Sequence, residues 1–168
     1  MTFDLQRQLD TATAFFLAGE RCSLELRFKE YGFHSVSAPT IVNYAFSVEL
    51  ALKLIHSLAF GTPAGGHNLE DLFGKLPGEI RINLPHLSER VSEIARYFED
   101  WRYPFEKSFL IGDIENPRRA FIECYREVKR LRPQLASVYE SLWGSFEPGW
   151  VQPGTETEFR WELRPAGT

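Results

Sequence analysis

The chain has 168 residues, of which 43% are hydrophobic and 14% aromatic, enough for one compact domain with an aromatic-rich core. Its formal net charge of −4 excludes nucleic-acid binding by overall charge alone, so any such binding requires a local basic patch. Cys22 and Cys124 lie far apart, without a CxxC motif or a secretory signal, which predicts buried free thiols in a cytoplasmic protein.

The first half of the chain predicts three helices. Residues 4–31 have apolar side chains at helical spacing and contain no proline, which indicates the first helix. Residues 40–60 are apolar almost all the way round, which is typical of a central helix. Because charged and polar residues interrupt this segment, we expect no membrane span. Residues 67–77 predict a short helix with Asn68 as its N-cap.

The second half predicts two further helices joined by a connector. Residues 85–103 have an apolar stripe at helical spacing. Residues 108–117 are expected to form the connector, with Asn116 as the cap of the next helix. That helix is expected over residues 117–143, with a kink or a break near Pro133.

The C-terminal segment has a different pattern. Apolar and charged side chains alternate over residues 155–164, which predicts a strand, and residues 149–154 could pair with it as a hairpin. The sequence therefore predicts an all-α fold, an up-and-down bundle of about five helices with a short C-terminal β-hairpin. We expect the bundle to cover residues 1–143 and a C-terminal extension to cover residues 144–168.

Charged residues on the central helix indicate a first candidate site. Glu49, Lys53 and His56 fall within about 60° of one another around the axis of an otherwise apolar helix. A buried Glu–Lys pair must be compensated and is typical of a pocket or an interface. The same stripe would also fit the solvent-exposed edge of the helix.

Basic residues on the last helix indicate a second candidate site. They lie opposite its apolar side and could bind phosphate groups, although an ordinary solvated face fits them as well. These residues are Arg118, Arg119, Arg126, Lys129, Arg130 and Arg132. No group of His, Cys, Asp and Glu has the spacing of a metal site, and His67 fits a helix start better than a metal ligand. We therefore predict no metal and no cofactor.

Three short motifs follow one another along the chain: ELALKLI (49–55), GHNLEDLF (66–73) and WRYPFE (101–106). In this order and at this spacing they resemble the HEPN superfamily, named for higher eukaryotes and prokaryotes nucleotide-binding domains. The resemblance covers roughly residues 5–142. The matching residues are Glu49, Lys53, Gly66, His67, Asn68, Leu69, Arg102, Tyr103 and Pro104.

The resemblance implies a helical bundle that usually dimerises, with its polar site facing the dimer cleft. Many members are metal-independent ribonucleases of toxin–antitoxin, CRISPR and phage-defence systems, and they use an Arg followed after four to six residues by a His. In this chain no histidine follows Arg102 at that spacing. The spacing recurs from Arg27 to His34 and from Arg81 to His86, about as often as chance predicts and outside the family's position.

We therefore expect a non-catalytic or degenerate HEPN-like homodimer in the cytoplasm, acting in a bacterial stress, toxin–antitoxin or defence context. Its cleft would bind a nucleotide or RNA, with Arg102 as the anchor, or would simply hold the dimer together. The residues expected to bind the nucleotide or RNA are Glu49, Lys53, His67, Arg102, Tyr103, Arg119, Arg126 and Arg130.

Two alternatives stay open. The first is a metal-independent endoribonuclease in which Arg102 stabilises the phosphorane and Glu106 or a histidine transfers protons. The second is a purely structural bundle that binds a protein partner, with the C-terminal hairpin pairing with another chain. No membrane partner is expected in either case.

Overall fold

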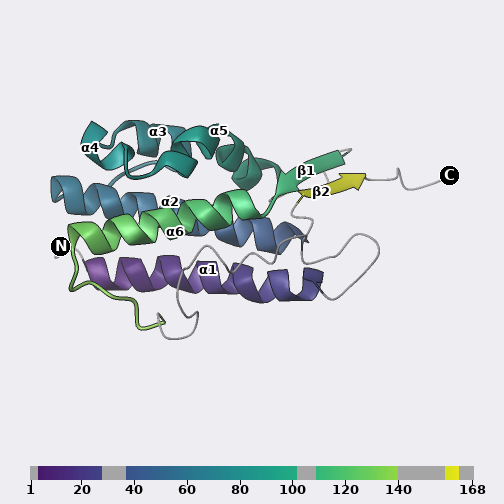
Figure 1. Cartoon of the computed structure of the whole chain (residues 1–168), viewed down its shortest axis with the longest axis horizontal. Helices are drawn as coiled ribbons and strands as arrows, with labels where there is room; N and C mark the ends of the chain where they lie inside the picture. The colour runs from purple at the N-terminus through teal and green to yellow at the C-terminus, as the bar shows by residue number, and fades with distance from the viewer. Residues whose placement is uncertain (1–3, 28–36, 102–108, 140–157, 163–168) are drawn as a thin grey trace.

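The computed structural model describes residues 4–27, 37–101, 109–139 and 158–162, and these residues are mostly helical (Figure 1). The helical fold class is thus confirmed. In chain order the elements are α1 (Leu5–Arg27), α2 (Ser37–Phe60), α3 (Leu69–Gly74), α4 (Gly78–Arg81), α5 (Pro85–Asp100), β1 (Phe109–Asp113), α6 (Glu115–Leu131) and β2 (Glu158–Glu162). The short helix α4 was not predicted from the sequence.

Helix α2 is the central element of the bundle, as predicted. It packs against α1, α3, α5 and α6 (Figure 1). Tyr44, Val48, Leu52 and Ile55 are all fully buried, because apolar residues occur on nearly every side of the helix. The window Ala38–Phe60 is long and apolar enough to cross a membrane, but 61% of it is buried inside the protein. That burial is typical of the core helix of a soluble protein.

A buried polar network joins α1, α2 and α6. The Tyr44 hydroxyl and the Arg118 Nε both donate to Glu20 Oε1, each at 2.6 Å. Arg118 Nη1 also donates to Glu115 Oε2 at 3.4 Å. Arg118 was predicted on the basic side of the last helix, opposite its apolar side, where it would bind phosphate or face solvent. This prediction is wrong, because its side chain is only 5% exposed and lies between two carboxylates.

Helix α6 differs from its predicted bounds at both ends. It begins at Glu115, whose backbone N–H donates to Asp113 Oδ1 at 2.9 Å, so Asn116 is not the cap. It ends at Leu131, and the following residues 132–139 form turns rather than helix. The predicted break is therefore confirmed: Pro133 has no N–H and disfavours a helical residue before it.

The two strands pair with each other at one end of the bundle (Figure 1). β2 lies within the strand predicted at residues 155–164 and runs antiparallel to β1, with Glu158 opposite Asp113. β1 lies in the segment predicted as a connector. The predicted hairpin partner of this strand, residues 149–154, lies outside the described residues.

Both cysteines are free, as predicted, but only Cys124 is buried and Cys22 is half-buried. Burial raises the pKa of both thiols, which keeps them protonated and unreactive near neutral pH.

Close packing of α1 on α2 gives a test of the fold. A Cβ added at Gly19 would lie 2.6 Å from the buried Tyr44 ring, whereas one added at Gly74 would meet nothing within 4 Å. We expect Gly19→Ala to lower the free energy of unfolding by about 1–3 kcal/mol. Gly74→Ala should raise it by up to about 1 kcal/mol. Urea denaturation measures both, and equal effects would contradict the packing described.

Candidate functional site

Three of the predicted site residues meet on α2. Lys53 Nζ lies 2.7 Å from Glu49 Oε1, and His67 Nδ1 lies 2.9 Å from the same oxygen. The Glu49 side chain is only 1% exposed, so the carboxylate is buried between two basic groups. We call Glu49, Lys53 and His67 the Glu49 cluster. Two motifs that are separate in the sequence therefore come together in the fold.

The backbone conformation before α3 and the cap of this helix explain how His67 reaches α2. Gly66 has a φ of +88°, a left-handed conformation that favours glycine, and it turns the chain just before His67. Asn68 then caps α3, because its side chain accepts a hydrogen bond from the Asp71 N–H at 2.9 Å. The predicted cap is confirmed. His67 was expected to serve the helix start, but its imidazole instead contacts Glu49.

One oxygen of the buried carboxylate is left open. Among the described residues, Glu49 Oε2 has no hydrogen-bond partner. A buried acceptor without a donor costs about 1–3 kcal/mol, more when the group is charged. A donor from a ligand would remove this cost. The Glu49 cluster is therefore polar, buried at its centre and incompletely satisfied.

The cluster is accessible through its two basic members. The side chain of Lys53 is 20% exposed and that of His67 is 77% exposed. Lys53 also lines a cavity of about 250 Å³ together with Arg7 and Gln8 of α1. Gln8 Oε1 is buried, and it too lacks a hydrogen-bond partner within the described part of the chain. A ligand with an anionic group and a polar hydrogen could contact Lys53, Arg7 and Gln8 in this cavity, which is also lined by Asp4.

The arginines predicted to bind phosphate, Arg119, Arg126 and Arg130, are exposed on α6, and two of them lie beside acidic neighbours. Arg130 forms a two-point ion pair with Glu127, at 2.6 and 2.7 Å, and this interaction raises the pKa of Arg130. Arg119 Nε lies 3.9 Å from Glu115 Oε2. Arg126 is exposed and also has an interaction partner. The basic face of α6 is thus partly neutralised by the helix itself.

Trp101, the first residue of the third motif, lies near a different level of α2 from the Glu49 cluster. Arg102, Tyr103 and Glu106 lie outside the described residues, but Trp101 is buried, and both Trp101 and Ile41 border Gly112. Ile41 precedes Glu49 by eight residues, which is about 12 Å along the helix axis. A ligand that contacted both motifs would have to bridge this distance.

The other described histidines have structural roles. His56 Nδ1 lies 3.2 Å from the Thr62 carbonyl oxygen, so His56 does not join the Glu49 cluster despite its place on the same stripe. His86 links α5 to α6. Its backbone N–H donates to Glu123 Oε1, and its imidazole Nε2 lies 3.1 Å from the Asn116 carbonyl oxygen. The Arg81–His86 spacing therefore reflects helix packing. His34 lies outside the described residues.

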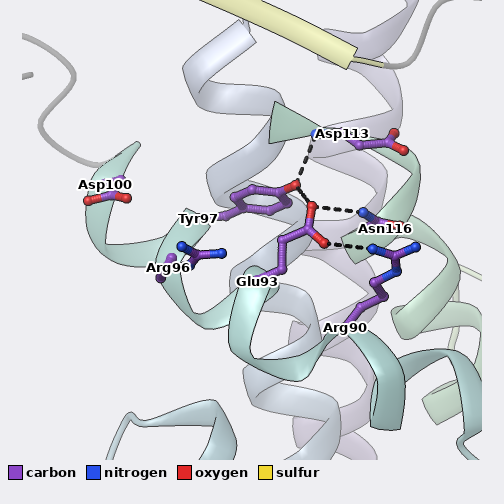
Figure 2. A pocket seen from close by; sticks show the side chains of 7 residues that line it. All are labelled: Arg90, Glu93, Arg96, Tyr97, Asp100, Asp113 and Asn116. Carbon is purple, nitrogen blue, oxygen red and sulfur yellow. Dashed lines mark hydrogen bonds and ion pairs between the residues drawn. The ribbon is translucent and has the colours of Figure 1, made fainter. Parts of the chain in front are cut away.

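Sequence reasoning missed a polar pocket on α5. Arg90, Glu93, Arg96 and Tyr97 line a cavity of about 430 Å³ between α5 and the start of α6 (Figure 2). The helix itself was predicted from its apolar stripe alone. The signal for the pocket was the spacing of polar residues at intervals of three and four along the opposite face.

Comparisons of the chain with protein-family models, with curated proteins and with solved structures found no match. Within the described residues, no three or more His, Cys, Asp or Glu side chains are grouped so that they could hold a metal ion.

Coupling within the Glu49 cluster can be measured directly. In a double-mutant cycle with Glu49→Gln and Lys53→Met, we expect a coupling energy of about 2 kcal/mol, because the hydrogen-bonded charge pair is shielded from water. A cycle on Glu115 and Arg119 provides the control, since this pair has the same spacing and Arg119 is 56% exposed. It should give about 0.5 kcal/mol or less. Glu115 is buried like Glu49, so equal coupling in both cycles would contradict the closer and less exposed contact described for Lys53.

Proposed function

We propose that this protein is a HEPN-like domain that binds the phosphate groups of a nucleotide or RNA at the Glu49 cluster without cleaving the ligand. It would act as a cytoplasmic homodimer in a bacterial stress or defence context. Its bundle would follow the up-and-down arrangement of about five helices, completed by the C-terminal hairpin.

One observation carries the proposal. Glu49 and Lys53 belong to the first HEPN-like motif and His67 to the second, and these residues are joined by two contacts to one carboxylate oxygen. The two motifs do not lie on the same helix, so their residues come into contact only in the folded chain. This contact supports a common function for the three residues, which the sequence alone shows only as parts of two separate motifs.

The chemistry of the cluster favours phosphate. The ammonium of Lys53 is compact and can act as a point charge toward a phosphate oxygen. Arg7 adds a second cation from α1 on the same cavity. His67 keeps its Nε2 directed away from Glu49, because Nδ1 makes the contact with the carboxylate. Together these groups offer several donors to a bound anion.

The apolar surroundings of the cluster support the dimer. Leu50 of α2 and Leu5 of α1 pack on the core but stay partly exposed. Leu50 also lines the cavity next to Lys53. A second copy of the chain would cover these side chains and close the site from one side.

Binding of a single-stranded RNA oligonucleotide in EDTA tests the proposal. By fluorescence anisotropy, we expect Lys53→Ala to weaken binding about tenfold, since one charge-assisted contact of roughly 1.4 kcal/mol is lost. Lys75→Ala provides the control, because Lys75 is exposed at the end of α3. Sedimentation of the same sample should give the mass of two chains of 19.4 kDa each plus that of the bound RNA. Equal binding by both variants, or a monomeric complex, would overturn the proposal.

A second function, metal-independent cleavage of RNA, is favoured by one contact. The Glu49–His67 pair has a buried carboxylate against one imidazole nitrogen and an exposed second nitrogen. Such a pair orients an imidazole for proton transfer. Arg102 would then stabilise the charge that develops on the phosphorus oxygens.

Cleavage in the absence of metal distinguishes the two functions. Under the main proposal, wild-type protein in EDTA leaves labelled RNA intact while binding it. Under the second function, wild type cleaves the RNA, and His67→Ala and Arg102→Ala each lower the rate at least tenfold. His86→Ala is the matched control, since His86 only joins α5 to α6. Cleavage that no variant reduces would point to a contaminating nuclease.

A further inference from the structure

A polar pocket on α5 has no part in the proposed function. Its walls come from α5, from the end of β1 and from the start of α6 (Figure 2). The volume of about 430 Å³ is within the range of small-molecule sites. Its lining includes Arg90, Glu93, Arg96, Tyr97, Asp113 and Asn116. We call it the Arg96 pocket.

The acidic centre of the Arg96 pocket is already satisfied. Glu93 Oε1 accepts hydrogen bonds from the Tyr97 hydroxyl and from Asn116 Nδ2, the latter at 3.0 Å. Glu93 Oε2 accepts from Arg90 Nη1 at 3.3 Å. The Tyr97 hydroxyl in turn accepts from the Asp113 N–H at 3.0 Å. Both Glu93 oxygens therefore have donors, and the network fixes the floor of the pocket before any ligand arrives.

The other two carboxylates of the lining, Asp113 and Asp100, also have interaction partners. Asp113 Oδ1 accepts from the Glu115 N–H at 2.9 Å, and Figure 2 shows its carboxylate directed away from Glu93. Asp100, at the rim, has an interaction partner as well. Burial and the Glu93 carboxylate raise the pKa of Tyr97, although the Asp113 N–H acts against this shift, so the hydroxyl stays a donor. Both oxygens of Glu93 and Oδ1 of Asp113 are therefore already used by donors of the protein.

Two guanidinium groups remain open. Arg96 is exposed and forms no ion pair with any residue that the structure describes. Arg90 is 50% exposed and uses only one nitrogen in its contact with Glu93. In Figure 2 the two side chains stand on either side of Glu93. The N–H donors of Arg96 and the remaining N–H donors of Arg90 are therefore available to a ligand in the pocket.

We infer that the Arg96 pocket binds a small molecule through an oxyanion, either a phosphate monoester or a carboxylate. Arg96 makes the main contact with the oxyanion and Arg90 the second. The planar fork of N–H donors on arginine matches the geometry of both groups. The network around Glu93 holds Arg90 in place, which lowers the entropic cost of binding. This site is separate from the Glu49 cluster and does not depend on it.

Isothermal titration with two probes tests the inference and distinguishes the sources of the oxyanion. Ribose 5-phosphate represents the phosphate monoesters and citrate the carboxylates, with sodium chloride of equal ionic strength as the blank. We expect wild type to bind one probe with one site per chain, and Arg96→Gln to bind it at least tenfold more weakly. Arg81→Gln, on the exposed helix α4, is the matched control and should bind like wild type.

Further variants separate this site from the proposed RNA site. Arg90→Gln should weaken binding of the probe in the same direction as Arg96→Gln, and Lys53→Ala should leave it unchanged. Circular dichroism confirms that each variant is folded. Equal binding by the Arg96 and Arg81 variants, or no binding of either probe by wild type, would overturn the inference. Loss of probe binding in Lys53→Ala alone would place the anion at the Glu49 cluster instead.

Discussion

The buried carboxylate of Glu49 is the constraint on which the candidate site depends. It lies at 1% exposure on α2, the helix against which α1, α3, α5 and α6 pack. A charge in that position is costly unless cations reach it. Lys53 reaches it from one turn further along the same helix, and His67 from a residue 18 positions away in the sequence. The contact with His67 thereby ties the start of α3, and with it the packing of α3 on α5, to the centre of the bundle.

A second buried charge shows how a purely structural ion pair differs from the candidate site. Arg118 lies between Glu20 and Glu115, and Tyr44 completes the network with its hydroxyl. These groups are paired with one another and are shielded from solvent, so they hold α1, α2 and α6 together. The Glu49 cluster is also buried at its centre, but it keeps an open carboxylate oxygen and an imidazole that is 77% exposed. The unpaired oxygen and the exposed imidazole, rather than burial alone, distinguish it as the candidate site.

Structural features that depend on residues close to one another in the chain could be predicted from the sequence. The cap at Asn68 and the break before Pro133 each follow from one residue and its neighbours, and the central place of α2 follows from its apolar surface. The Glu49–Lys53 pair follows from helical spacing. Strand β1 was missed because five residues around a glycine give no clear alternation, and its pairing partner is distant in the chain. Arg118 and the Arg96 pocket were missed because their partners come from other elements.

We propose that a phosphate ligand binds at the Glu49 cluster. Imidazole nitrogen resonances, followed by NMR during titration with a single-stranded RNA oligonucleotide, test it within one molecule. His67 reports on the cluster, and His86, held between α5 and α6, serves as the internal reference. The account predicts that the His67 resonances shift as the complex forms while those of His86 stay in place. A complex that forms without any change at His67 would contradict it.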